Sequence, residues 1–390
     1  MTAAGPATIT LPKLLIVGAE AHRQIAATLG KLGVGRPLIV TDPYMRDCGM
    51  LGRITSVLDD AAIPWRAFAD TVPDPTTDVI AAGVAVLRGD DFDSLIALGG
   101  GSPMDTAKAM AVLATHGGAM RDYKVPAEVD RADFPVIAIP TTAGTGSEVT
   151  RFTVITDTET NEKMLCMGLA YVPAAALVDY TLTLTMPWRL TADTGLDTLT
   201  HAIEAYVSKK RNPFADTMAL SCMGLVARHI RTVCRRPEDH DARAAMMLAA
   251  TQGGMAFSNA SVCLVHGMSR PIGAHFHVPH GLSNAMLLPA IAAFSAPEAT
   301  GRYADCARAM GAAAADADDG TAVAGLLDEL ARLNAELEVP SPKAYGIDES
   351  RYFSLLETMA EQALASGSPG NNPRVPSPAE IVDLYKQAWT

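Results

Sequence analysis

Four side chains of this sequence are suited by type and spacing to bind a metal ion. Asp197 and His201 lie in a stretch, 193–206, that has no proline and has apolar residues at helical spacing, so we expect a helix. Their spacing of four places a carboxylate and an imidazole one turn apart on one face. His266 and His280, each followed by glycine, could complete a site with one oxygen and three nitrogen donors. Such a set suits Fe²⁺ or Zn²⁺, although an isolated Asp-x-x-x-His pair is usually only a surface hydrogen bond.

A glycine-rich loop is the first candidate for binding an anionic cofactor. Gly99-Gly-Gly-Ser102 follows an expected strand at 94–98, and Ser102 and Pro103 suit the N-cap and first position of a helix. Glycines let backbone amides approach an anion, and a helix N-terminus adds positive potential. The loop is neither a Gly-x-Gly-x-x-Gly nor a Walker A motif, so a pyrophosphate site and a simple tight turn are both open.

A second loop and an aspartate could bind the rest of a dinucleotide. Residues 139–150, after an expected strand at 135–139, carry hydroxyls that could contact ribose and phosphate; the alternative is a plain connection to the next strand, 152–155. Asp42 follows an expected strand, where a carboxylate can accept from the adenosine 2′-hydroxyl and repel a 2′-phosphate. This indicates NAD rather than NADP. The alternative is an ordinary turn aspartate before Pro43.

The elements that must position these residues differ between the two halves of the chain. The first half alternates apolar runs with helical patterns, at 14–17, 21–32, 37–40, 50–61, 65–68, 76–87, 94–98 and 135–139. Such alternation predicts an α/β fold with a doubly wound, mostly parallel, Rossmann-like sheet. After Thr181, Ala, Leu and Met at helical spacing dominate, at 202–209, 214–234, 242–255, 323–337 and 379–389. We expect a dinucleotide-binding α/β domain at 1–182 and an all-helical metal-binding, catalytic domain at 183–390.

The composition argues against several classes of protein. The chain has 390 residues, 49% of them hydrophobic, which is enough for a sizeable core. Its net charge of −12 and the lack of a basic stripe argue against a nucleic-acid partner. We find no secretory signal and no convincing membrane span, and the six cysteines have no Cys-x-x-Cys spacing. We expect a cytoplasmic protein with reduced cysteines and no nucleic-acid or membrane partner.

Jointly, these motifs resemble the iron-containing (group III) alcohol dehydrogenase family. The matching segments are Val40-Thr-Asp42, 99–108, 140–150, 197–206, His266-Gly-Met and Pro279-His280-Gly281. The resemblance runs over nearly the whole chain and implies that a metal is held by Asp197, His201, His266 and His280. It also implies that the nicotinamide cofactor contacts Asp42, Gly99, Gly100, Gly101, Ser102, Asp105, Thr141, Thr142, Thr145 and Lys163. We further expect a homodimer or a higher homo-oligomer.

One position near the expected metal departs from the pattern of this family. Many members carry a second histidine four residues after the position of His266, where this chain has Arg270. Arginine stays protonated and cannot act as a general base, but it could hold a substrate carboxylate, phosphate or sulfonate. The alternative is an internal ion pair. His277, with His275 close by, then becomes a candidate for the proton-relay role.

These expectations define a reaction. A divalent cation would lower the pKa of an alcohol and stabilise negative charge on its oxygen while hydride passes to nicotinamide C4; in reverse it would polarise an aldehyde carbonyl. We therefore expect an NAD-dependent oxidoreductase that acts on a small alcohol or aldehyde, and Arg270 extends the expected substrates to those that carry an anionic group. The alternatives are a hydroxyacid–oxoacid transhydrogenase, a lyase resembling dehydroquinate synthase, and a non-catalytic metal- or nucleotide-binding protein. The lyase would need a basic cluster for a phosphate-bearing substrate, which the sequence does not show.

Overall fold

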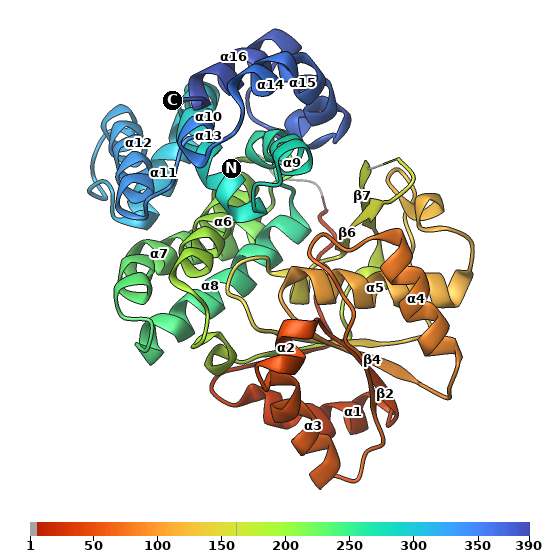
Figure 1. Ribbon diagram of the computed structural model, residues 1–390. Coiled ribbons are helices and arrows are strands. Elements are labelled where there is room, and N and C mark those ends of the chain that lie inside the picture. Colours follow the sequence, from red (N-terminus) through yellow and green to blue (C-terminus); the bar gives the residue numbers. More distant parts are fainter. Residues whose placement is uncertain (1–5, 161) are drawn as a thin grey trace. The chain divides into compact units, whose positions relative to one another are not determined.

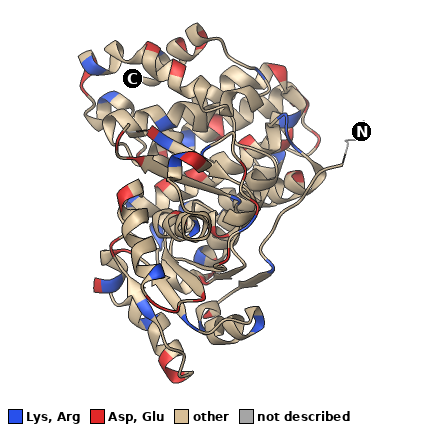
Figure 2. Ribbon diagram, turned by 90° about the vertical axis from the view of Figure 1, so that its right-hand side faces the viewer, with Lys and Arg blue, Asp and Glu red and all other residues tan. Residues whose placement is uncertain are grey.

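The computed structural model describes residues 6–160 and 162–390 (Figure 1). The chain forms two compact units, one of residues Thr10–Met186 and one of Pro187–Thr390 with the described residues before Thr10. Acidic and basic residues are interleaved along the ribbon of both units in the view of Figure 2. In the described part of the chain, no helix combines the length and the apolar character that a membrane crossing requires.

The first unit is built on a six-stranded sheet in which every pair of neighbours is parallel, as the alternating sequence pattern predicts. The strand order is β1-β8-β5-β4-β2-β3. The strands are β1 (Leu14–Val17), β2 (Pro37–Val40), β3 (Arg66–Phe68), β4 (Ser94–Gly99), β5 (Val136–Pro140) and β8 (Ala175–Val178). A separate antiparallel hairpin is formed by β6 (Phe152–Asp157) and β7 (Glu162–Met167).

Helices cover both faces of this sheet, because its central strands are apolar on both sides. Ile39 and Ile96 belong to one buried cluster with α1 (Ile25–Leu32) and α3 (Met50–Asp60). Leu38 belongs to a second cluster with α4 (Thr77–Arg88) and α5 (Gly101–His116), on the other face. The sheet is therefore doubly wound. The short helix α2 is Pro43–Asp47, and the 3₁₀ turns of this unit are η1 (Ala21–Gln24), η2 (Met120–Tyr123), η3 (Ser147–Val149), η4 (Leu169–Tyr171) and η5 (Tyr180–Thr183).

The strand order reverses between β2 and β4, which makes this the topological switch point of the sheet. Ligands of doubly wound sheets bind outside the carboxyl ends of the strands at such a point. Thr41, directly after β2, donates from Oγ1 to the carbonyl of Leu98 in β4 at 2.8 Å, which ties the two strand ends together. The fold thus brings Asp42 and the glycine-rich loop to the same edge of the sheet.

The second unit consists of helices, as the sequence predicts for this half. They are α6 (Trp188–Val207), α7 (Pro213–Arg235), α8 (His240–Asn259), α9 (Leu264–Phe276), α10 (His280–Ser295), α11 (Thr300–Met310), α12 (Asp319–Glu336), α13 (Pro342–Tyr345), α14 (Glu349–Ser354), α15 (Leu356–Ala365) and α16 (Pro378–Ala388), with 3₁₀ turns η6 (Ala296–Glu298) and η7 (Ser368–Asn371). Helix α6 is buried along most of its length and packs against α7, α8 and α10. It is the central element of this unit.

One local expectation was wrong. Helix α5 begins at Gly101, with Gly100 as N-cap, so Ser102 is the second helical residue instead of the N-cap. The turn is set by Gly99, whose φ of +145° suits glycine and whose absent side chain leaves room for Pro103. A Cβ at position 99 would lie 2.6 Å from Cγ of Pro103. Packing of the proline ring on the turn therefore overrides the capping preference of serine.

Candidate metal centre and cofactor loops

The four predicted ligands converge in the second unit. One potential ligand atom from each of Asp197, His201, His266 and His280 lies within 4.8 Å of every other. Oδ1 of Asp197 is 3.8, 3.6 and 3.9 Å from Nε2 of the three histidines in that order. The side chains of the first three residues are buried, whereas that of His280 is 46% exposed. The cluster is therefore accessible from the side of His280.

Two glycines let the helices that carry these ligands approach closely. Helix α6 supplies Asp197 and His201, α9 supplies His266, and His280 is the first residue of α10. A Cβ at Gly281 would lie 2.5 Å from the carbonyl oxygen of Asp193 and 3.3 Å from Cβ of Asp197. The N-terminus of α10 can thus rest on α6 only because position 281 has no side chain. Gly267, after His266, lies in the same way against the ring of Pro369.

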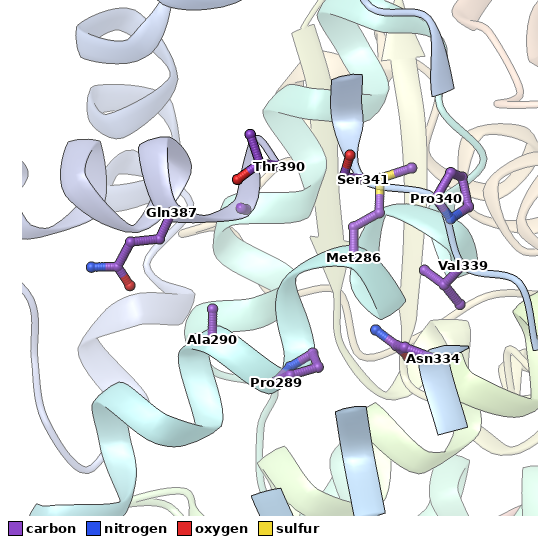
Figure 3. Close-up of a pocket in the computed structure, with 10 residues that line it drawn as sticks. Met286, Pro289, Ala290, Asn334, Val339, Pro340, Ser341, Gln387 and Thr390 are labelled. Carbon is purple, nitrogen blue, oxygen red and sulfur yellow. The ribbon is translucent and has the colours of Figure 1, made fainter. Parts of the chain in front are cut away.

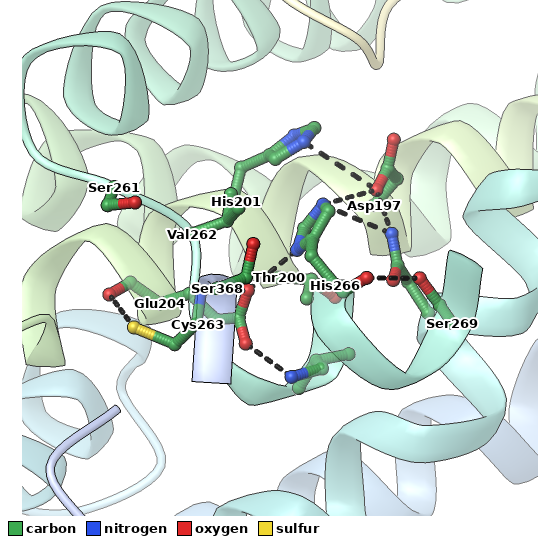
Figure 4. A network of polar contacts seen from close by, with 12 residues as sticks. Asp197, Thr200, His201, Glu204, Ser261, Val262, Cys263, His266, Ser269 and Ser368 are labelled. Atoms are coloured by element: carbon green, nitrogen blue, oxygen red, sulfur yellow. Dashed lines mark hydrogen bonds and ion pairs between the residues drawn. The ribbon is translucent and has the colours of Figure 1, made fainter. Parts of the chain in front are cut away.

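Glu204 orients one of the ligands, although sequence reasoning gave it no role. Its Oε2 is 2.6 Å from Nδ1 of His266, and its carboxylate accepts from the backbone amides of Cys263 and Val265 at 2.9 and 2.6 Å. Figure 4 shows His266 between Glu204 and Asp197. A carboxylate beside Nδ1 fixes the proton there and leaves the lone pair of Nε2 directed at the cluster. The sequence does carry a signal for this role of Glu204, namely a carboxylate three residues after His201 in an otherwise apolar stretch.

The electrostatics of the cluster keep its carboxylate ionised. Burial alone would raise the pKa of Asp197, but the three surrounding imidazoles outweigh it and hold the pKa below its ordinary value. Burial likewise acts to lower the pKa of His266, and the neighbouring carboxylates of Asp197 and Glu204 outweigh this and raise it. One anionic oxygen and three imidazole nitrogens in a buried cluster fit a divalent transition-metal ion.

Asn284 is a further polar residue of the cluster that sequence reasoning missed. It is fully buried on α10, one turn after His280. Its Nδ2 donates to Oδ1 of Asp197 at 2.7 Å. The same nitrogen is 3.2 Å from Nε2 of both His266 and His280.

Arg270 and His277 occupy different environments. Arg270 lies one turn after His266 and donates to Oγ of Ser368 at 3.1 Å. Within the described residues no carboxylate oxygen is within 4.0 Å of its guanidinium, so the internal ion pair considered above does not form. Burial lowers the pKa of Arg270, and the charge of Glu204 opposes this. His277 is the exposed C-cap of α9, and His275 contacts Oε1 of Gln362 at 2.9 Å.

The two predicted cofactor loops lie side by side in the first unit. A Cβ at Gly100 would be 3.3 Å from the side chain of Thr142, and one at Gly101 would be 3.2 Å from that of Thr145. The backbone amide of Thr141 donates to the carbonyl of Gly99 at 2.9 Å. The glycine-rich backbone and the hydroxyl-rich loop therefore form one continuous surface.

Two charged residues of α5, Asp105 and Lys108, hold the hydroxyl-rich loop against this helix. Asp105 is partly buried in α5 and accepts from Oγ of Ser147 and the amide of Val154, both at 2.9 Å. Nζ of Lys108 is fully buried and donates to acceptors in the segment 147–152, among them the carbonyls of Ser147 at 2.7 Å and of Phe152 at 3.0 Å. Both side chains are engaged inside the protein, where they hold the hydroxyl-rich loop to α5.

Two other predicted cofactor residues, Asp42 and Lys163, have partners of their own within the chain. Asp42 caps α2, because its Oδ1 accepts from the amide of Met45 at 2.8 Å. Nζ of Lys163, in β7, forms an ion pair with Oδ1 of Asp74 at 2.9 Å. Both remain partly accessible to solvent.

A pocket of about 210 Å³ in the second unit is separate from these residues (Figure 3). Its lining comes from α10, α12, the following loop and the C-terminal residues, and includes Met286, Asn334 and Thr390. None of the predicted site residues lines it.

Comparison with known proteins gives consistent matches along the chain. Residues 12–180 match the sequence model described as iron-containing alcohol dehydrogenase, and residues 191–389 match the C-terminal model of the Fe-containing alcohol dehydrogenase family. The chain is 33% identical to the NAD-dependent methanol dehydrogenase of Bacillus methanolicus, over 97% of this chain and 98% of that protein. It is 34% identical to the lactaldehyde reductase of Escherichia coli K12, over 92% and 93%. The crystal structure of a 1,3-propanediol oxidoreductase superposes with a TM-score of 0.94 at 32% identity, covering 98% of this chain and all of that one.

Proposed function

Because the chain belongs to the iron-containing alcohol dehydrogenase family, we propose that it is an NAD-dependent alcohol dehydrogenase or aldehyde reductase with one divalent metal ion. It is an oxidoreductase that acts on CH–OH groups of small alcohols or on the corresponding aldehydes. The observation that carries the proposal is the convergence of Asp197, His201, His266 and His280.

The proposed roles follow from the chemistry of these groups. Asp197, His201, His266 and His280 would hold the cation, which when bound acts as a Lewis acid towards an alcohol or carbonyl oxygen. Nicotinamide accepts or donates the hydride. Glu204 holds His266 in the tautomer whose Nε2 faces the cation. The buried ligands keep water from most of the cluster, and the exposed edge of His280 leaves the substrate a way in.

The cofactor proposal is NAD, held by the two loops at the switch point. Gly99, Gly100, Gly101 and Ser102 offer backbone amides at the N-terminus of α5, a site that favours phosphate. Thr141, Thr142 and Thr145 offer hydroxyls beside them, while Asp105 acts by holding that loop in place. Asp42, at the end of β2, would accept from the ribose 2′-hydroxyl and repel a 2′-phosphate. Lys163 would contact the cofactor from the hairpin.

We further propose Fe²⁺ as the metal, with Zn²⁺ as the alternative. Fe²⁺ with four protein ligands still has open positions for a substrate oxygen, whereas a four-ligand Zn²⁺ site would have to expand its shell. Intrinsic affinity nevertheless favours Zn²⁺. Metal analysis of protein purified without air, followed by activity of the apoprotein reloaded with each ion, distinguishes the two.

Arg270 supports a refinement of the substrate class. It is a guanidinium with one hydrogen bond, to Ser368, and with no carboxylate in contact among the residues described. Its place one turn after His266 suits it to hold an anionic group on the substrate. Arg270→Leu is then expected to reduce kcat/KM for a carboxylate-bearing aldehyde at least tenfold more than for a neutral aldehyde of equal length. Equal losses for the two substrates would dispose of this role.

The function is tested by following the absorbance of reduced nicotinamide with metal-loaded protein and a panel of alcohols, aldehydes and oxo acids. We expect turnover with free NAD and a small alcohol, and loss of turnover when a chelator removes the metal. Turnover that needs both a hydroxy acid and an oxo acid, with nicotinamide retained on the protein, would identify a transhydrogenase instead. Turnover that is unaffected by metal removal would overturn the proposal.

A further inference from the structure

Asn284 occupies a place in the cluster that its hydrogen bonding does not fully explain. Its amide nitrogen faces the carboxylate of Asp197 at 2.7 Å and Nε2 of His266 and His280 at 3.2 Å. The side chain is fully buried. Nδ1 of His266 is occupied by Glu204, so its Nε2 presents a lone pair towards Asn284. The amide nitrogen of Asn284 thus faces the lone pairs that a cation would use.

The other end of the amide is unsatisfied. Oδ1 of Asn284 is buried and has no hydrogen-bond partner in the described part of the chain. A buried carbonyl oxygen without a partner is costly, and in a native protein such an atom calls for a partner from outside the chain, an ordered water or an ion. An amide can exchange its nitrogen and oxygen by a half-turn about the Cβ–Cγ bond with almost no change of shape.

The two orientations of the amide suit two states of the centre. In the apoprotein, the amide of Asn284 is most stable with its NH₂ group facing the ligands. In that orientation it donates to Asp197 and to imidazole nitrogen. Beside a divalent cation the N–H groups would be repelled, whereas the carbonyl oxygen is the kind of donor that hard cations prefer. The half-turn therefore gives the oxygen a cation to bind, and it moves the NH₂ group to the position that the oxygen held.

We propose that Asn284 is a fifth residue of the metal centre, whose amide nitrogen pairs with the ligands in the apoprotein and whose carbonyl oxygen turns to the cation when it binds. The inference rests on the proposed function in that a divalent ion must bind at the four predicted ligands. A fifth, oxygen donor would favour Fe²⁺ relative to tetrahedral Zn²⁺. It would also couple metal binding to the packing of α10 against α6.

The test uses Co²⁺ as a probe in the full-length protein, with Asn284→Asp and Asn284→Ala. Asn284→Asp places a second carboxylate beside Asp197, so the apoprotein should melt at a lower temperature because like charges repel. The same substitution adds an anionic oxygen donor, so the Kd for Co²⁺ should fall at least tenfold. Asn284→Ala removes the fifth donor, so the visible absorption of bound Co²⁺ should intensify severalfold, as it does when coordination drops from five to four.

Asn334→Asp is the matched control. Nδ2 of Asn334 donates to the carbonyl of Ala285, directly after Asn284, but the residue contacts none of the four ligands. The Asn334→Asp variant should be less stable than wild type and should bind Co²⁺ with unchanged affinity. If Asn284→Asp behaves like this control, with a Co²⁺ affinity within threefold of wild type, the residue is merely structural and the proposal is overturned. An unchanged Co²⁺ spectrum in Asn284→Ala would overturn it as well. A wild type that binds no Co²⁺ would instead refute the metal centre of the proposed function.

Discussion

Gly281→Ala is the substitution for which the structure predicts the largest effect from the smallest change. Gly281 does not have a left-handed backbone, so its requirement is for space and not for conformational freedom. An added Cβ would lie 2.5 Å from the carbonyl oxygen of Asp193 and 2.9 Å from its carbonyl carbon. Both are backbone atoms of α6, which cannot rotate away as the end of a side chain can. Helix α10 must therefore move.

The size of the movement follows from these contacts. Ordinary contacts of a Cβ begin at 3.4 Å, so the N-terminus of α10 has to retreat by about 0.9 Å. Metal–ligand distances tolerate deviations of only about 0.2 Å. His280, the residue before Gly281, would thus leave the reach of a cation held by the other three ligands. Metal affinity should fall on the order of 100-fold or more, since disturbing even outer-shell partners costs 10–100-fold, and overpacking should cost about 1–3 kcal/mol of stability.

Isothermal titration of the apoprotein with Zn²⁺ measures the metal affinity, and thermal unfolding of the same samples measures the loss of stability. Gly301→Ala in α11 is the control, because the nearest atom to its added Cβ would be a side-chain oxygen of Asp319 at an ordinary 3.4 Å. We expect it to alter stability by less than about 0.5 kcal/mol and metal affinity not at all. Metal binding by Gly281→Ala within threefold of wild type would refute the claim that this contact positions His280.

Three further substitutions test other parts of the site. His266→Ala should abolish both bound metal and NAD-linked alcohol oxidation, measured by metal analysis and reduced-nicotinamide absorbance; survival of both would contradict the assignment. Asp42→Gly should relax the preference for NAD over NADP, and an unchanged ratio of kcat/KM values would remove Asp42 from the cofactor site. Lys108→Met should destabilise the first unit by about 3–5 kcal/mol, because it leaves the acceptors of the segment 147–152 unpaired. Burial lowers the pKa of Lys108 to about 8 from 10.5. Between these values the unfolded chain binds more protons, so wild type should gain stability relative to Lys108→Met as pH rises from 8 to 10.5; parallel stability curves in denaturant melts would argue against this.

The parts of the fold that the sequence predicts are those with strong local patterns. β2, β4 and β5 are apolar runs because both faces of a covered parallel sheet are buried, and such runs are visible without knowledge of their neighbours. β8 was missed, although its residues are also buried on both faces. The run Ala175–Val178 is short, alanine-rich and preceded by Pro173, so it has little strand signal of its own. It becomes a strand by pairing between β1 and β5, a contact between distant segments.

Helix caps show the same limit at smaller scale. Ser102 has a good capping side chain, but the helix starts two residues earlier than that cap would place it, because Gly99 and Pro103 pack into a turn that fixes the chain direction. The sequence is equally consistent with Asp42 as a turn residue and as a cofactor ligand, and in the structure Asp42 caps α2. Capping leaves one of its oxygens uncommitted, so the structural and the proposed functional role are compatible.

The residues that sequence reasoning missed in the metal centre share a position. Glu204 follows His201 by three residues and Asn284 follows His280 by four, and each is a polar side chain in a largely apolar helix. A helix that presents a ligand to a buried cluster necessarily presents the residue one turn further on to the surroundings of that cluster. A polar residue can stay buried there only if it bonds to the ligands or to their partners. Arg270, four residues after His266, occupies the third such position, and among the described residues its guanidinium donates to Ser368. A polar residue one helical turn after a ligand, in an otherwise apolar helix, is therefore the sequence signal for such a partner.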